Sequence, residues 1–338
     1  MSNIIKFSEN LNVHKLIIGN EYLKAEISTL GATLVNLRLL KTKDQRDVVW
    51  GLNSAEEYLA HDKYFGTTAG RVAGRIDKGQ FTLNGETYQL AKNNNGNALH
   101  GGIEGFDKKI FDYEFIDNGI RFTYTSKDGE EGYPGTLDVI VTYKLVKDAL
   151  HIDYYAIADK DTIINLTNHS YFNLEGHRSS SILNHTLQVC ADELLNIDPD
   201  SCPRGSRLTL ANTPFDFHKE KKIRECINGE HEQLINAKGI DHFFIFNKKE
   251  NQITLKGGDG VVTLTVNTNQ PGANIYSANY LDGNLVGKEN RRYEEKSAIC
   301  LETQNYGNDI NINENPTSIL RKGLAYESHT EYIFKVEE

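Results

Sequence analysis

The sequence is poor in the residues that mark disulfide-rich proteins and flexible linkers. It has four cysteines and six prolines among 338 residues, and no segment rich in proline and serine divides it. The cysteines lie far apart and form no C-x-x-C pair, which argues against a disulfide framework or a zinc site. They are Cys190, Cys202, Cys226 and Cys300. We expect four reduced thiols that pack as small apolar side chains.

Long apolar runs are also missing. The first twenty residues, MSNIIKFSENLNVHKLIIGN, contain no apolar stretch of the length that a signal peptide needs. No later segment approaches the length of a membrane span. We therefore expect a cytoplasmic protein without a membrane partner.

Positive charge is in deficit. The chain has 37 lysine and arginine residues against 47 aspartate and glutamate residues, a formal net charge of −10. Such a balance repels phosphate backbones and anionic membranes, so we expect no nucleic-acid partner. It favours a neutral small molecule over an acidic one.

The common nucleotide and hydrolase motifs are absent. The sequence has no G-x-G-x-x-G after a strand, no G-x-x-x-x-G-K-[ST], no H-E-x-x-H and no G-x-S-x-G. The Gly258-Asp259-Gly260 triplet is interpreted as a turn. Dinucleotide chemistry, a phosphate-binding loop and serine hydrolysis are therefore not indicated.

What the sequence does contain is a period of two. Residues 113–125 alternate apolar and polar side chains around a turn at 117–119, which predicts a hairpin. The same alternation in 137–145 and 150–158 predicts a second hairpin, and that in 253–269 predicts a third. The segments LKAEISTLGATLVNLRLL and EYIFKVEE near the two ends also alternate or carry strand-forming residues.

Helical signals are few. Ser54 and Glu57 fit a capping box that opens a short helix before Tyr58, and residues 219–227 predict another. No repeat of solenoid type is present. Many strands with glycine, asparagine and aspartate turns, and no alternation of strands with helices, predict an all-β fold. We expect a large antiparallel β-sandwich in which residues 1–338 form a single domain.

Five short stretches place polar or ionisable residues beside glycine or aromatic residues. They are GRVAGR at 70–75, NALHGG at 97–102, LTNHSYFN at 166–173, GIDHF at 239–243 and CLETQN at 300–305. A sandwich with one concave polar face would bring such dispersed segments together.

In their order and spacing these stretches resemble the signature of the galactose mutarotase (aldose 1-epimerase) family. DGEEGYPG from Asp128, TPFDF from Thr213 and QPGANIYSANYLDG from Gln270 extend the resemblance. It covers the chain from about residue 65 to the C-terminus. The family fold is a large β-sandwich with an open sugar cleft, in agreement with the period of two.

The resemblance implies that Glu302 is the general base, His169 the general acid and His100 a second histidine near the reacting atoms. The implied reaction interconverts the α and β anomers of an aldohexose such as galactose or glucose. The anomeric hydroxyl loses a proton while the ring oxygen gains one, the ring opens, C1–C2 rotates and the ring closes again. A carboxylate and an imidazolium suffice for these transfers. We therefore expect no metal and no cofactor, a raised pKa for Glu302, and a protonated His169 near neutral pH.

The resemblance also implies that Arg75 and Asp241 hold sugar hydroxyls. Asn274 stands where the family often has glutamine, and we expect its shorter amide to reach a hydroxyl less well. Gly74 stands where many members carry asparagine, which removes another possible sugar contact. Arg71, in contrast, we expect in a solvated loop.

Two alternatives stay open at this point. A hexose-6-phosphate 1-epimerase would need additional basic residues to hold a phosphate dianion. A non-catalytic sugar-binding protein of the same fold would be expected to lack Glu302 or His169, and this chain has both. Without the resemblance, His169 alone would be interpreted as a buried core histidine. We expect a monomer or a homodimer.

Overall fold

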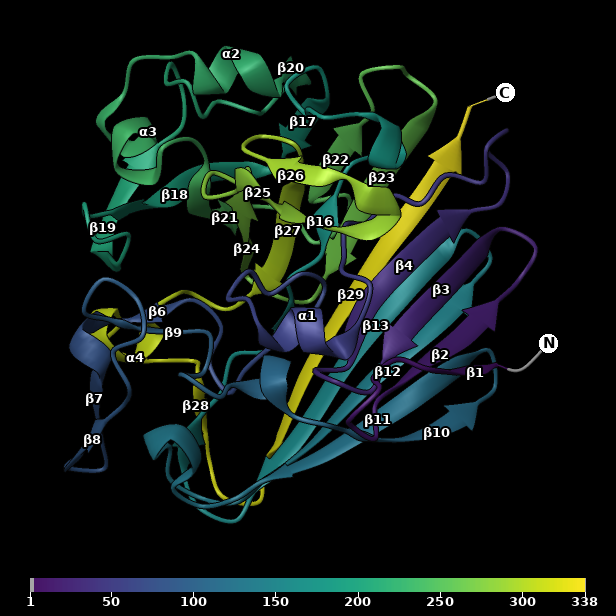
Figure 1. Ribbon diagram of the computed structural model, residues 1–338. Helices are drawn as coiled ribbons and strands as arrows, with labels where there is room; N and C mark the ends of the chain where they lie inside the picture. Colours follow the sequence, from purple (N-terminus) through teal and green to yellow (C-terminus); the bar gives the residue numbers. More distant parts are fainter. Residues whose placement is uncertain (1–2, 338) are drawn as a thin grey trace.

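The largest sheet of the computed structural model has nine strands, all antiparallel to their neighbours (Figure 1). The structure describes residues 3–337, so residues 1, 2 and 338 of the expected domain lie outside the described residues. In spatial order the strands are β10 (Asp112–Ile116), β11 (Gly119–Ser126), β12 (Leu137–Val146), β13 (Ala149–Ala158), β29 (Ala325–Val336), β23 (Val262–Thr268), β22 (Ile253–Lys256), β17 (Thr186–Val189) and β20 (Lys221–Lys222). The three predicted hairpins are confirmed as β10–β11, β12–β13 and β22–β23.

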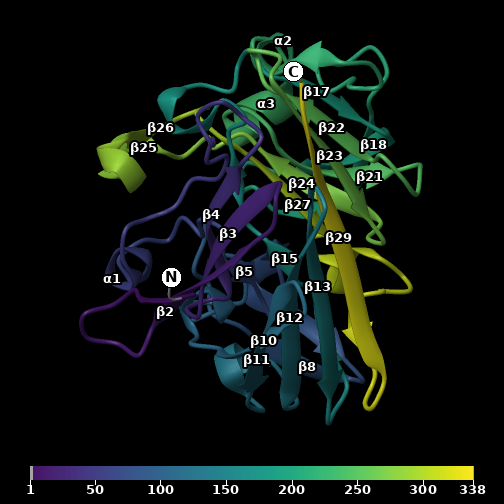
Figure 2. The ribbon, with the colours of Figure 1, turned by 90° about the vertical axis from the view of Figure 1, so that its right-hand side faces the viewer.

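Two smaller sheets pack against one face of this large sheet. The six-stranded sheet has the order β16 (Tyr171–Phe172), β27 (Ile299–Gln304), β24 (Gly272–Tyr276), β21 (Asp241–Phe246), β18 (Ala191–Ile197) and β19 (Pro203–Thr209). The four-stranded sheet has the order β1 (Ile4–Lys6), β2 (His14–Gly19), β3 (Leu23–Ser28) and β4 (Thr33–Leu39). Figure 2 shows β3 and β4 to one side of the long strands β12, β13 and β29. The predicted all-β sandwich is therefore confirmed.

The alternation of side chains explains why the sheets stack. Along β12, Leu137, Val139 and Val141 are buried, whereas Asp138 is exposed. The buried set joins side chains of both smaller sheets in one apolar core. The Tyr143 hydroxyl donates to the Ala32 carbonyl at 2.7 Å, at the side of the four-stranded sheet. Each sheet thus buries one face in the core, and its other face is turned away from the core.

Short strand pairs and helices fill the remaining connections. The pairs are β5 (Thr68–Ala69) with β15 (Thr167–Asn168), β6 (Arg75–Ile76) with β9 (Ala98–Leu99), β7 (Gln80–Leu83) with β8 (Glu86–Gln89), β14 (Thr162–Ile163) with β28 (Ile319–Leu320), and β25 (Asp282–Val286) with β26 (Arg292–Glu294). The α-helices are α1 (Ala55–Leu59), α2 (Ile223–Ile227), α3 (Glu232–Ala237) and α4 (Asp309–Ile312). Short 3₁₀ turns occupy Asp77–Gly79, Phe106–Lys108, Glu130–Gly132, Gly176–Arg178 and Lys288–Asn290.

The helix predicted before Tyr58 is confirmed as α1. The helix predicted over residues 219–227 forms only as α2 from Ile223, because Lys221 and Lys222 pair with β17 as strand β20. Helices α3 and α4 were not predicted. Ser54 caps α1, and its side chain accepts from the Glu57 backbone N–H at 3.3 Å. Within residues 3–337, no helix combines the length and the apolar character that crossing a membrane requires.

The expectation of a solvated loop at Arg71 is wrong. Its guanidinium is buried and donates to the Ser126 hydroxyl, the Ser126 and Lys127 carbonyls and the Pro134 carbonyl at 2.9–3.0 Å. A guanidinium can be buried in this way because its several N–H groups find fixed acceptors.

Candidate active site

The strands β24 and β27 carry two of the expected site residues side by side. On β27, Ile299 and Leu301 face the apolar core, so Glu302 points to the opposite face of the six-stranded sheet. Asn274 lies directly across from Glu302 in the antiparallel register of β24 and β27. The period of two therefore directs a carboxylate and an amide into the same space.

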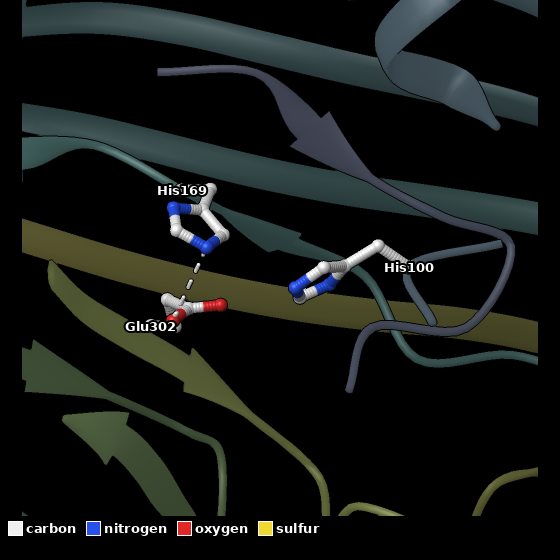
Figure 3. Close-up of side chains that lie close together, drawn as sticks. All are labelled: His100, His169 and Glu302. Atoms are coloured by element: carbon white, nitrogen blue, oxygen red, sulfur yellow. Dashed lines mark ion pairs between the residues drawn. The ribbon is translucent and has the colours of Figure 1, made fainter. Parts of the chain in front are cut away.

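The two expected catalytic histidines come from connections between short strands. His169 lies between β15 and β16, and its backbone N–H donates to the Thr67 carbonyl at 2.9 Å. His100 follows β9 with a φ of 49°, and its Nδ1 accepts from the Gly74 N–H at 3.3 Å. That acceptor role places the proton of a neutral ring on Nε2. Figure 3 shows both imidazoles directed toward the Glu302 carboxylate.

Close backbone packing holds the loop that carries His100. At Gly101, φ is 96° and an added Cβ would lie 1.8 Å from the Gly70 carbonyl oxygen. Glycine is therefore required directly after His100, which explains part of the NALHGG stretch.

All six site residues expected from the sequence line one cavity of about 280 Å³. They are Arg75, His100, His169, Asp241, Asn274 and Glu302. The cavity is close to the lower end of the range of about 300–1,000 Å³ that small-molecule sites usually occupy. The structure thus brings together segments from residue 75 to residue 302 that the sequence separates.

Glu302 and His169 form the ionisable centre of the cavity. His169 Nε2 and Glu302 Oε1 are 3.7 Å apart, and both side chains are buried. Burial, reinforced by the charge of Asp241, raises the pKa of Glu302 to about 8, against a hydrogen bond from Asn274 that lowers it. Burial lowers the pKa of His169 to about 4. At neutral pH the free site therefore holds a protonated carboxyl and a neutral imidazole, which corrects the expected protonated His169.

A polar chain connects Glu302 to the expected sugar-binding residues. Asn274 Nδ2 donates to Asp241 Oδ1 at 2.9 Å and to Glu302 Oε1 at 3.4 Å. Arg75 Nη1 lies 3.7 Å from Asp241 Oδ2, and Arg75 Nε donates to Asn94 Oδ1 at 3.0 Å. Asn274 thus bridges two carboxyl groups, a contact that sequence reasoning did not foresee.

Three side chains of the cavity could also hold a metal ion. One ligand atom each of His100, His169 and Glu302 lies within 4.8 Å of the others. Two imidazoles and a carboxylate are a donor set that zinc accepts. The expectation that no metal takes part in the reaction stays a prediction.

The sequence as a whole matches the family model described as Aldose 1-epimerase over residues 14–333. The chain belongs to the aldose 1-epimerase family. It is 41% identical over 332 residues to galactose mutarotase from Sus scrofa, covering 96% of this chain and 94% of that relative. It is 37% identical over 320 residues to aldose 1-epimerase from Haemophilus influenzae, covering 93% of each. A crystal structure of an aldose epimerase homologue from C. elegans matches with a TM-score of 0.89 at 27% identity, covering 96% of this chain and 99% of that one.

Membership of the aldose 1-epimerase family confirms the predicted fold and the predicted class of activity, an isomerase. These matches give no support to the alternatives, a hexose-6-phosphate 1-epimerase or a non-catalytic sugar-binding protein.

Two further cavity residues of this family member were missed in the sequence. Gln304 lines the cavity, and its buried Oε1 has no hydrogen-bond partner among residues 3–337. Because Gln304 follows Glu302 by two residues on β27, the alternation of side chains along a strand could have identified it.

Tyr64 also lines the cavity. Its ring centroid lies 4.7 Å from that of His100, and no sequence motif marks it. At Gly74 an added Cβ would lie 3.4 Å from Gln304 Nε2, so glycine leaves that amide uncovered.

Proposed function

We propose that this cavity binds a neutral aldohexose such as galactose or glucose and interconverts its α and β anomers. In the proposed reaction Glu302 and His169 exchange protons with the anomeric hydroxyl and the ring oxygen. Ring opening, rotation about C1–C2 and reclosure then deliver the other anomer. None of these steps makes a bond between the protein and carbon.

One observation carries the proposal: a buried carboxyl oxygen that faces the cavity without a partner. Glu302 Oε2 is buried and has no hydrogen bond from any residue between 3 and 337. An unsatisfied buried acceptor is costly, so its natural partner is a donor that arrives with the ligand. A sugar hydroxyl is such a donor.

Glu302 and His169 hold one proton between them, so one member of the pair can act as an acid while the other acts as a base. In the free site the proton is on Glu302, because its pKa is about 8 while that of His169 is about 4. A hydroxyl that donates to Oε2 stabilises the carboxylate form and favours transfer of this proton to His169. Glu302 then acts as general base and His169 as general acid, and their roles reverse for ring closure. His100, neutral because burial holds its pKa well below the usual value, donates a hydrogen bond from Nε2 to the substrate.

The remaining polar side chains suit a sugar rather than a sugar phosphate. Among the described residues that line the cavity, the basic side chains are Lys63 and Arg75. Lys63 lies 3.0 Å from an Asp62 oxygen and Arg75 3.7 Å from an Asp241 oxygen, so both cations already face a carboxylate. We propose that Arg75, Asp241 and Asn274 bind the sugar hydroxyls, which both donate and accept hydrogen bonds.

Polarimetry tests this function directly. The enzyme should accelerate the change of optical rotation of freshly dissolved α-galactose and α-glucose, whereas glucose 6-phosphate should respond much less. Acceleration confined to the phosphorylated sugar would refute the proposed substrate class.

We further propose a single domain, a reducing cytoplasmic location and a monomeric or homodimeric state. One apolar core contains residues from Leu16 to Phe334, in support of a single domain. All four cysteines are free, in support of a reducing compartment. Light scattering of the purified chain measures the oligomeric state.

A further inference from the structure

The solvent-facing side of the nine-stranded sheet carries a second compact cluster of ionisable residues. It consists of His151 on β13 with His329 and Glu331 on β29, and one ligand atom of each lies within 4.8 Å of the others. In the register of β13 and β29, His151 is directly opposite Glu331. We call these three residues the outer cluster.

The spacing of the outer cluster matches a tetrahedral metal. His329 Nε2 lies 3.4 Å from Glu331 Oε1, and His151 Nδ1 lies 3.6 Å from the same oxygen. Zinc bonds of about 2.0–2.1 Å in a tetrahedron place neighbouring ligand atoms about 3.4 Å apart. Two of the three separations therefore fit one ion, and the ligand atoms of His151 and His329 lie within 4.8 Å of each other.

Two neighbouring side chains orient the ligands. Asp153 Oδ1 contacts His329 Nδ1, which leaves the Nε2 of the same ring free to face Glu331. Asn267 Nδ2 donates to Glu331 Oε2 at 3.1 Å, which leaves Oε1 for the cluster. A carboxylate behind a histidine and a donor behind a carboxylate are the usual supports of metal ligands. The cluster thus contains three possible metal ligands and two side chains that hold two of these ligands in place.

The outer cluster is open to solvent and separate from the catalytic cavity. Its side chains are 18% exposed at His151, 29% at Glu331 and 40% at His329. Thr330 lies between His329 and Glu331 on β29 and faces the interior of the sandwich. Its hydroxyl lies 2.6 Å from that of Thr303 on β27. An ion at the outer cluster would therefore lie across the sheet from Glu302.

We propose that His151, His329 and Glu331 form a zinc-binding site on the outer face of the nine-stranded sheet. The three residues supply two nitrogens and one oxygen, and water completes the tetrahedron. Since β13 and β29 are adjacent strands, the ion joins them through their side chains as well as their backbones. The proposal is independent of the epimerase activity, because it uses none of the cavity residues.

A zinc titration by calorimetry tests the site. The Glu302→Gln background removes the carboxylate of the cavity, so that zinc bound there does not confuse the measurement. We expect this variant to bind one zinc ion saturably. Adding Glu331→Gln should weaken the affinity at least tenfold. Adding Glu327→Gln, a matched change on an exposed β29 residue opposite Tyr155, should leave it unchanged. Adding Asp153→Asn should weaken it about 10–100-fold, as loss of an orienting carboxylate does.

Two outcomes would overturn the proposal. One is the absence of saturable zinc binding in the Glu302→Gln variant at submillimolar concentrations. The other is equal affinity with and without Glu331→Gln. If Glu331→Gln folds poorly, the ring nitrogen signals of His151 and His329 in the Glu302→Gln variant decide by NMR. Zinc must shift both sets of signals, and unchanged signals would refute the site.

Discussion

At the scale of single residues, the proposed chemistry depends on one proton that a buried pair of side chains shares. Glu302 and His169 are 3.7 Å apart, and burial moves their pKa values in opposite directions, to about 8 and about 4. Each shift alone would make the residue poorly suited to its proposed role. Together they ensure that the pair carries one proton over several pH units, which is the state that acid and base catalysis by the pair requires.

Replacing the carboxyl tests its role. Glu302→Gln keeps the shape of the side chain and removes proton transfer, so kcat should fall by about 10²–10⁴-fold with a modest change in KM. Polarimetry at several sugar concentrations separates the two constants. Glu294→Gln, an exposed change on β26, is the control. A near-normal kcat in the Glu302 variant would refute the assignment.

The pH dependence follows from the two pKa values. Below the His169 pKa of about 4 the pair gains a second proton and loses its base. Above the Glu302 pKa of about 8 it loses its last proton and its acid. We therefore expect kcat/KM to be flat between these values and to fall on both sides. A profile that rises steadily from pH 5 to 7 would contradict the shared proton.

Asn274 influences the pH above which kcat/KM falls. Its amide donates to Glu302, and this hydrogen bond lowers the pKa of the carboxyl. Asn274→Ala removes the donor, so the fall of kcat/KM at alkaline pH should move to higher pH. Asn94→Ala is the matched control, because Asn94 lines the same cavity but contacts Arg75. An unmoved alkaline limb in the Asn274 variant would show that the amide acts on the sugar alone.

At the scale of strands and loops, the sequence predicts what depends on near neighbours. The β12–β13 hairpin was predictable, because alternation and the Lys147-Asp148 turn are local features. Helix α3 was not predicted, and its buried Gln233 exchanges hydrogen bonds with the backbone of Ile197 on β18, a contact between segments that lie far apart in the sequence. The outer cluster escaped prediction because His151 and His329 meet only through strand pairing. The proposed catalytic residues were predicted only through the resemblance to a family, since nothing local distinguishes His169 from a core histidine.

The burial of Arg71 likewise could not be predicted from its near neighbours in the sequence. Its contacts lead us to expect that substitution of Arg71 lowers the stability of the protein. Arg71 ties the end of β11 and the following loop to the segment before β6 through the Ser126, Lys127 and Pro134 acceptors. Lysine has one nitrogen and cannot replace this set, so several buried acceptors would lose their donors. Arg71→Lys should lower the free energy of unfolding by about 2–4 kcal/mol in urea titrations.

The matched control for this change is Arg121→Lys. Arg121 is an exposed residue of β11 that pairs with Glu114, and such pairs contribute about 0–1 kcal/mol. An equally small effect of Arg71→Lys would mean that water replaces the lost hydrogen bonds.

At the scale of the whole molecule, the two faces of β29 are turned toward two separate proposed sites. The inner face supports β27, the strand that carries Glu302, since the Tyr332 hydroxyl donates to the Leu301 carbonyl at 3.0 Å. The outer face carries the zinc site proposed above. A stacked sandwich can keep such sites apart because interdigitated side chains of the core separate the two faces.

This separation predicts the response to metal removal. Exhaustive dialysis against EDTA should remove zinc from the outer cluster, and the loss is measured by elemental analysis. The rate of mutarotation should nevertheless equal that of the untreated enzyme, because in the proposed mechanism Glu302 and His169 transfer the protons without a metal. The melting temperature should fall on dialysis and recover with added zinc, since an ion that binds the folded chain stabilises it by mass action. Glu331→Gln is the control, and its melting temperature should respond to neither treatment. Loss of activity that zinc restores would instead place a metal at His100, His169 and Glu302, whose ligand atoms also lie within 4.8 Å of one another.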